Sequence, residues 1–216
     1  MRFFEYAFNL IYPNVCGMCG RLCQESLCKK CEIKLNKIAK IKIDRYEDKY
    51  FTKHLSAFKY EGMIKQKLID YKFNEKSYLY KSIAKFLLNS KKVCAFLESY
   101  DIIIPVPIHK YRRRERGYNQ SALIARKLAR SVEGLTYNDS ILYKEKNIAP
   151  QSNKTKEQRK KDVIGVYSLR NQEKIKGKKI LLLDDIYTTG STVNECCRML
   201  REACVATVDV ITIAKD

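Results

Sequence analysis

The sequence has little of what several familiar classes of protein require. Of its 216 residues none is Trp, only four are Pro and eight are Gly, and no run of 18 or more apolar residues occurs. The low Pro and Gly content argues against collagen-like or low-complexity structure, and the lack of a long apolar run argues against a membrane-spanning helix. Hydrophobic residues make up 45% of the chain, enough for one good-sized core and a small appendage. The sequence therefore predicts a compact globular protein.

Acidic residues are also scarce, with 24 Asp and Glu against 43 Lys and Arg and a formal charge of +19. Such an excess of positive charge favours polyanionic partners: nucleic acid, phosphorylated metabolites or an acidic membrane surface. A Lys-rich surface that serves only solubility is the alternative.

The first residues carry no clear export signal. Their apolar residues fall at positions 3, 4, 7, 8 and 11, interrupted by Glu5 and Asn9, without a small-residue cleavage site. This spacing predicts an amphipathic helix that ends before Pro13. Without an export signal we expect a cytoplasmic protein, whose cysteines bind metal or lie buried more often than they form disulfides.

Five of the nine cysteines lie between residues 16 and 31. Four of them form two Cys-x-x-Cys turns, namely Cys16, Cys19, Cys28 and Cys31. Each turn can offer two sulfurs to one tetrahedral zinc ion. Four sulfur ligands leave no open position, so the predicted site is structural. A redox-active Cys-x-x-Cys is the alternative, but it needs only one pair and a thioredoxin-like strand, which is absent. Cys23 belongs to neither turn.

The remainder of the chain alternates between strand-like and helix-like patterns. Strands are predicted near residues 55–60, 102–106, 180–185 and 205–214, and helices near 64–71, 79–87, 120–132 and 191–203. Residues 144–162 are polar without periodicity, which indicates a functional lid or loop. The prediction is an α/β fold with a mainly parallel sheet over residues 46–216, preceded by a helix and zinc module over residues 1–45.

The most informative segment follows the apolar run 180–183. Two carboxylates, Asp184 and Asp185, stand where the strand ends, and ligands bind at this end of parallel strands. A hydroxyl-rich turn then opens a helix, where backbone N–H groups can hold a phosphate. The segment comprises Asp184, Asp185, Tyr187, Thr188, Thr189, Gly190, Ser191 and Thr192. Carboxylates accept hydrogen bonds from sugar hydroxyls, so the sequence predicts a ribose 5-phosphate site. A strand, a tight turn and a simple helix cap are the alternative.

This segment resembles the phosphoribosyl pyrophosphate (PRPP) motif of the type I phosphoribosyltransferases. A second region, Ile104-Pro-Val-Pro-Ile-His through Gly117-Tyr-Asn-Gln120, together with Tyr12-Pro-x-x-Cys-x-x-Cys19 and Phe58-Lys-Tyr-Glu-Gly62, resembles the ComF family of competence-associated proteins. The likeness extends over essentially the whole chain. It implies a type I phosphoribosyltransferase fold, with Asp184 and Asp185 on the ribose hydroxyls and the Thr-Thr-Gly-Ser-Thr loop on the 5-phosphate.

The same resemblance implies where a leaving pyrophosphate would lie, usually together with Mg²⁺. The residues expected to contact it are Pro107, Arg112, Arg114, Arg116, Asn119, Gln120 and Arg159. A solvated basic turn is the alternative reading of the Arg cluster. His109 could act as a general acid, although a lone His is more often structural.

Three functions are compatible with these residues. The first is a cytoplasmic competence protein that receives single-stranded DNA and partners a helicase; residues 108–130 hold eight basic residues, one acid and two interleaved Tyr. The second is a working phosphoribosyltransferase, which would transfer ribose phosphate to a base and release pyrophosphate. The third is a sensor that binds PRPP without turnover. The acceptor base cannot be read from the sequence.

Overall fold

The computed structural model describes residues 15–147 and 163–216. Its centre is a six-stranded sheet of order β1-β2-β8-β7-β3-β4. The strands are β1 (Ala39–Arg45), β2 (Lys53–Lys59), β3 (Ile102–Pro105), β4 (Thr136–Tyr137), β7 (Lys179–Tyr187) and β8 (Thr207–Lys215). All neighbours are parallel except β1 and β2. The mainly parallel α/β fold is therefore as predicted.

Strands β7 and β3 are buried because apolar residues continue through them without alternation. Burial covers all of β3 and most of β7, as expected for parallel strands with both faces covered. Two apolar clusters lie on the sheet, one including residues of α3 (Gly62–Phe73), α4 (Leu79–Leu88), α5 (Lys91–Leu97) and α7 (Gln120–Ala129), the other residues of α9 (Ser191–Glu202).

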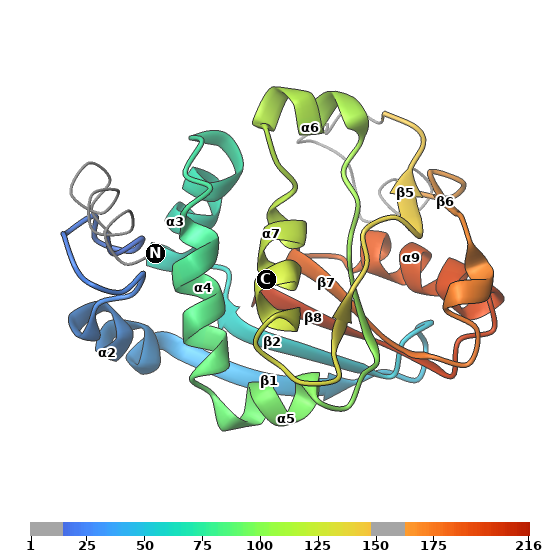
Figure 1. Cartoon of the computed structure of the whole chain (residues 1–216), viewed down its shortest axis with the longest axis horizontal. Helices are drawn as coiled ribbons and strands as arrows, with labels where there is room; N and C mark the ends of the chain where they lie inside the picture. Colours follow the sequence, from blue (N-terminus) through green and yellow to red (C-terminus); the bar gives the residue numbers. More distant parts are fainter. Residues whose placement is uncertain (1–14, 148–162) are drawn as a thin grey trace, which may run out of the picture.

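Several elements had no prediction from the sequence. They are α2 (Lys29–Ile38), β1, α5, the short helix α6 (Lys110–Arg116), β4, the turn η1 (Gln172–Lys174), and a small antiparallel sheet of β5 (Leu142–Lys144) with β6 (Tyr167–Leu169). Figure 1 shows α6 at the top of the view, above α7, and the β5–β6 pair beside α9. The predicted helix at residues 3–11 lies outside the described residues.

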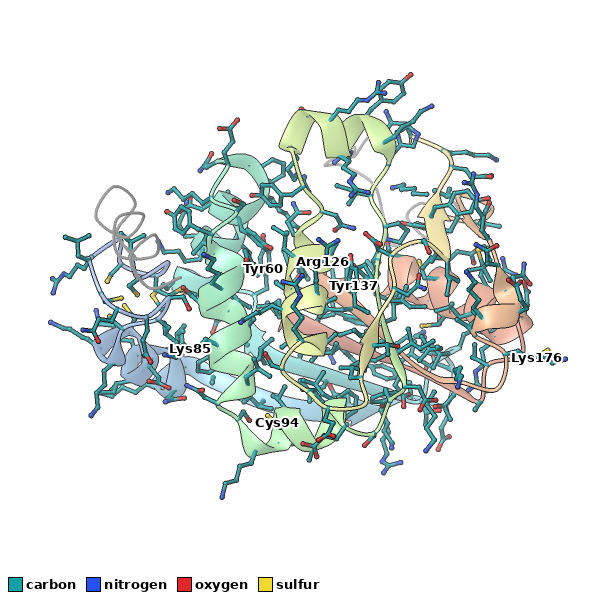
Figure 2. All side chains as sticks on the ribbon, in the orientation of Figure 1. Tyr60, Lys85, Cys94, Arg126, Tyr137 and Lys176 are labelled. Carbon is teal, nitrogen blue, oxygen red and sulfur yellow. The ribbon has the colours of Figure 1, made fainter. Side chains whose placement is uncertain are left out.

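The cysteine-rich segment packs against the larger domain. Its residues Met18, Leu27 and Leu35 are buried in the same apolar cluster as α3 and α4. Helix α2 (Lys29–Ile38) leads directly into β1, which pairs with β2 of the larger domain. Strand β1 nevertheless falls within residues 1–45, the range predicted for the zinc module. Lys85 of α4, labelled in Figure 2, forms an ion pair with Glu25. We therefore expect the module and the domain to stabilise each other.

None of the helices in the described ranges is both apolar enough and long enough to cross a membrane.

Candidate functional site

Four cysteine side chains come together at one end of the fold. The sulfurs of Cys16, Cys19, Cys28 and Cys31 all lie within 4.8 Å of one another, and no other group of three or more His, Cys, Asp or Glu with metal-ligand spacing occurs within residues 15–147 and 163–216. A tetrahedral zinc ion with bonds of about 2.3 Å places its sulfurs about 3.8 Å apart, so the cluster can hold a metal ion after small side-chain movements. Cys23 is outside it, and its thiol donates to the Glu25 carbonyl at 2.6 Å.

The backbone between the cysteines forms hydrogen bonds that hold their sulfurs close together. The Gly20 N–H donates to the Cys16 carbonyl, at 2.7 Å, and Gly20 takes a positive φ of 73°, which closes the first turn. The Cys28 N–H points to the Cys16 sulfur at 3.4 Å. Burial opposes ionisation of the Cys16 thiol, but the backbone donors outweigh it and lower its pKa to about 7. A thiol that ionises readily suits metal binding.

The two predicted acids lie at the carboxyl end of β7, between β8 and β3. Asp184 Oδ1 accepts hydrogen bonds from the Asp185 N–H at 2.9 Å and from Ser121 Oγ at 3.3 Å. Burial and the neighbouring Asp185 carboxylate raise the pKa of Asp184 to about 7, although Lys72 opposes the shift. The Asp185 side chain is only 8% exposed and pairs with Lys72, its Oδ2 lying 2.9 Å from Nζ. The pair therefore has one lysine as its adjacent counter-ion.

A hydroxyl-rich loop connects this pair to α9. Thr189 Oγ1 and Ser191 Oγ lie 2.9 Å apart, and α9 begins at Ser191 with no side-chain cap and no acid in its first turn. The Ser191 N–H donates to Thr189 Oγ1 at 3.4 Å, and the N–H groups of the following residues in the first turn can bind an anion. Gly190 has φ +72°, and an added Cβ there would lie 2.2 Å from the Tyr187 hydroxyl oxygen. Tyr187 is itself buried, and its ring lies 4.4 Å from that of His54. The same ring packs against Gly190 in the loop.

Only some of the residues predicted to contact pyrophosphate line a common cleft. Arg112 and Arg116 line a cleft of about 240 Å³ that also includes Lys72, whereas Arg114 is exposed outside its lining. Burial lowers the pKa of Arg116, and Asp185 acts in the opposite sense, which puts the guanidinium within electrostatic reach of the acid pair. Pro107 is partly buried between β3 and α6. Arg159 lies outside the described residues.

The side chains of Asn119 and His109 have structural partners in this conformation, whereas the Gln120 amide nitrogen has none in the described part of the chain. Asn119 donates from Nδ2 to the Val106 carbonyl at 3.0 Å and caps α7 by accepting from the Ser121 N–H at 3.1 Å. Gln120 is 2% exposed, and its Nε2 is one of two buried side-chain atoms that have no hydrogen-bond partner within the described ranges. His109 caps α6, and its Nε2 lies 3.1 Å from the Glu145 carbonyl.

The structure adds four polar side chains to which the sequence assigned no role at this site. They are Lys72, Ser121, Lys144 and Tyr167. Lys144 and Tyr167 come from the β5–β6 pair, and both interact electrostatically with Asp184. Burial and then Arg112 lower the pKa of Lys144. No local pattern marks these residues, because each lies far along the chain from the acids.

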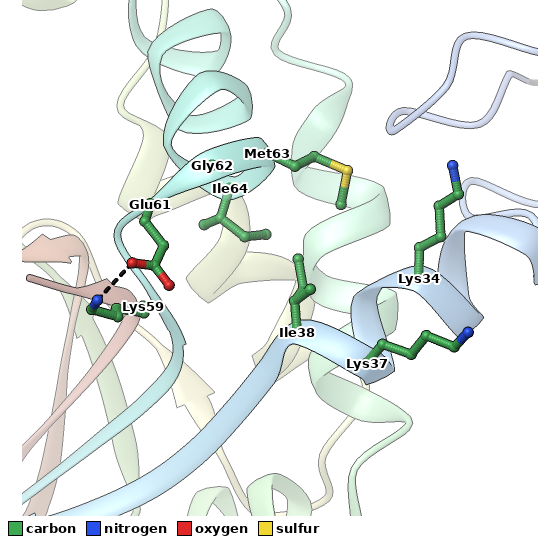
Figure 3. A pocket seen from close by; sticks show the side chains of 8 residues that line it. All are labelled: Lys34, Lys37, Ile38, Lys59, Glu61, Gly62, Met63 and Ile64. Atoms are coloured by element: carbon green, nitrogen blue, oxygen red, sulfur yellow. Dashed lines mark hydrogen bonds and ion pairs between the residues drawn. The ribbon is translucent and has the colours of Figure 1, made fainter.

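A second hollow, of about 700 Å³, lies between α2 and the start of α3 (Figure 3). Its wall contains Lys34, Lys37 and Lys59, and Ile38 and Met63 supply apolar surface. Lys59 is already paired with Glu61 at 2.6 Å. This hollow is larger than the cleft beside Lys72, but its lining does not include the acid pair or the hydroxyl loop. The cleft does not include them either, but Lys72 in its wall pairs with Asp185, so the cleft borders the acid pair, to which we assign the sugar-phosphate chemistry.

Comparison with known proteins finds similarity to one domain family and to several competence proteins. Residues 118–216 match the phosphoribosyl transferase domain family. Competence protein F of Haemophilus influenzae is 28% identical over 149 residues, covering 67% of this chain and 65% of that protein, just under two thirds. Competence protein ComFC of Bacillus subtilis is 28% identical over 194 residues, covering 89% and 73%. Among solved structures, glutamine PRPP amidotransferase from B. subtilis matches with 23% identity and a TM-score of 0.41, over 63% of this chain and 26% of that one.

The match to the phosphoribosyl transferase domain family covers the acid pair and the hydroxyl loop of this chain, which also has the sheet order and the four-cysteine cluster described above. The chain is therefore similar to ComFC-like competence proteins, and it has a type I phosphoribosyltransferase fold with a four-cysteine module near its N-terminus.

Proposed function

We propose that this protein binds PRPP at the Asp184–Asp185 pair and single-stranded DNA on its basic surface, and that it acts in DNA uptake. The observation that carries the PRPP site is the acid pair at the end of β7, followed by the hydroxyl loop at the start of α9. Two carboxylates suit the ribose hydroxyls, and free N–H groups with hydroxyls suit the 5-phosphate.

The DNA part of the proposal is supported by the charge around this site. Helix α6 carries Lys110 and four arginines with one acid, and none of its residues is buried. Arg126 extends the basic surface along α7, where its guanidinium lies 4.9 Å from the centre of the Tyr137 ring (Figure 2). Lysines and arginines beside exposed rings bind single strands by phosphate contact and base stacking. The names of the relatives, competence proteins, agree with this use.

The four-cysteine cluster would hold zinc with a structural role. Four sulfurs close the coordination shell, so the ion would stabilise the module rather than activate water. Mg²⁺ would accompany PRPP by neutralising its diphosphate. A helicase partner and a cytoplasmic location belong to the same proposal.

The test of the PRPP site is a calorimetric titration of PRPP with Mg²⁺ into the zinc-loaded chain. We expect binding in the native protein and none in the Asp184→Ala, Asp185→Ala double variant. An Asp44→Ala variant is the matched control, since Asp44 pairs with Lys215 on the β1 side of the sheet. Absence of PRPP binding to the native chain would refute the PRPP site.

The DNA site is tested by oligonucleotide binding at increasing salt. We expect the Arg112→Gln, Arg116→Gln variant to bind more weakly and to reduce the slope of log K against log salt by about 1.4, or about 0.7 for each phosphate contact. The Lys174→Gln, Lys176→Gln variant removes the same charge at exposed positions near η1, away from α6, and should change little. DNA binding that is absent at ~50 mM salt would refute this part.

The second candidate function is phosphoribosyl transfer, favoured by three cations that line the neighbouring cleft, Lys72, Arg112 and Arg116, of which Lys72 contacts Asp185. A base nitrogen would form a bond to C1 of the ribose while the C1–O bond breaks, its electrons leaving with diphosphate and the nitrogen proton passing to water. The cations would stabilise the departing charge. The test is to measure diphosphate release with a panel of bases. Faster release by the native protein than by the Asp184→Ala, Asp185→Ala variant, with any base, would establish transfer. PRPP binding without release would leave a ligand sensor.

A further inference from the structure

One large aromatic side chain is exposed beside the acid pair. Phe73, the last residue of α3, is 66% exposed. A single exposed apolar residue is ordinary on a protein surface. Phe73, however, directly follows Lys72, whose ammonium group contacts Asp185 at 2.9 Å. The ring therefore lies at the entrance to the site described above.

The surroundings of Phe73 combine three kinds of chemistry. Its ring lines the 240 Å³ cleft together with Lys72, Glu75, Arg112, Glu115 and Arg116. The Arg116 guanidinium carbon lies 5.3 Å from the ring centre, and most of Phe73 still remains open to a second planar group. Aromatic rings and guanidinium planes are the surfaces on which unpaired bases stack. Glu75 and Glu115 can accept from the N–H groups at a base edge.

The size of the cleft restricts what can occupy it. Pockets for drug-sized ligands are roughly 300–1,000 Å³, so about 240 Å³ suits one ring system and is too small for a stacked pair. Glu75 also adopts a left-handed backbone with φ 52°, which is uncommon for a residue other than Gly and costs energy. Such strain is compatible with a carboxylate held for binding.

We propose that the cleft between Phe73 and α6 binds a single nucleobase, stacked on Phe73, with Arg112 and Arg116 placed for an attached phosphate. Its location beside a ribose site depends on the proposed function, but binding of the base does not. The base can come from a free nucleobase or from one residue of a single strand. The cations favour the strand, because a free base has no phosphate for them to bind.

Fluorescence of 2-aminopurine provides the test, since stacking on an aromatic ring quenches it. The probe is used both as the free base and within a short single-stranded oligonucleotide, with the full zinc-loaded chain. We expect quenching by the native protein and by Phe73→Tyr, which keeps an aromatic face. Phe73→Leu, which keeps apolar bulk, should weaken binding of the probe by about tenfold or more and abolish the quenching.

Tyr78→Leu is the matched control, because Tyr78 is another exposed ring in the same region but does not line the cleft. Equal quenching by the native protein and Phe73→Leu would overturn the proposal, as would loss of quenching in Tyr78→Leu alone. The two sources are distinguished by which probe binds.

The experiments can distinguish failure of the base site from failure of the PRPP site. Quenching that depends on Phe73 in a protein that does not bind PRPP would leave the base site standing and remove the PRPP site. PRPP binding with no effect of Phe73→Leu on either probe would do the reverse.

Discussion

Replacing Asp184 by Asn should stabilise the folded protein at alkaline pH. The substitution is nearly isosteric, and Asn Oδ1 can still accept from the Asp185 N–H and from Ser121 Oγ. What it removes is a negative charge that burial and the Asp185 carboxylate oppose. That opposition raises the pKa of Asp184 from 3.8 to about 7. The folded native protein is therefore less stable when Asp184 is ionised than when it is neutral.

The magnitude follows from the pKa difference. About three pH units correspond to about 4 kcal/mol between the two protonation states. Asp184 is partly exposed, so solvent reduces this limit, and we expect about 1–3 kcal/mol. Between pH 4 and pH 7 the folded state binds a proton that the unfolded state has released, so this group makes stability fall as pH rises. The Asn variant should therefore exceed the native protein by a small margin at pH 5 and by a larger one at pH 8.

The assay is urea unfolding at pH 5 and pH 8, with zinc in excess and both proteins compared at each pH. Asp209→Asn is the contrasting control. Its Oδ1 accepts from two backbone N–H groups and its Oδ2 from the Tyr100 hydroxyl at 2.8 Å. The neutral amide weakens the two backbone hydrogen bonds and turns an NH2 group toward the hydroxyl donor, which should cost about 1–3 kcal/mol at both pH values. An Asp184→Asn protein less stable than native at pH 8, or a difference between the two proteins that does not grow with pH, would refute the reasoning.

Three further changes have defined outcomes. Cys16→Ser should reduce bound metal to near zero by elemental analysis and make residues 15–38 sensitive to protease, since metal binding contributes on the order of 10 kcal/mol in such modules. Gly190→Ala places a Cβ 2.2 Å from the Tyr187 hydroxyl oxygen at φ +72°, so PRPP binding should be lost by calorimetry while the circular dichroism spectrum persists. Lys72→Met leaves Asp185 without its cation and should cost about 3 kcal/mol in urea unfolding, with PRPP affinity reduced; unchanged stability would show that the ion pair contributes nothing.

Local sequence patterns were sufficient to predict those features that are formed by residues close together in the chain. The apolar run before Asp184 produces a buried strand, so the acids fall at its carboxyl end without further information. Two Cys-x-x-Cys turns likewise bring four sulfurs together with few residues between them. The helix predicted at 191–203 is confirmed as Ser191–Glu202, because its apolar face repeats every three to four residues.

Elements without a periodic signal escaped prediction. Strand β5 has three residues and pairs with β6 across a long connection, which leaves too few positions for alternation to show. Helix α6 is basic throughout and buries none of its residues, so it has no apolar face to detect. The basic cluster was recognised from composition, but which of its arginines line the cleft was not.

The sequence by itself determined the α/β class, the four-cysteine ligand set and the acid-and-hydroxyl motif, because each depends on short-range spacing or on burial of a continuous apolar run. Only the tertiary structure decided that Lys72 neutralises Asp185, that Lys144 and Tyr167 reach Asp184, and that Phe73 faces a cleft with α6. These contacts join side chains from different helices and strands. They depend on how α3, α6 and the β5–β6 pair pack around the carboxyl end of the sheet, which no local pattern encodes.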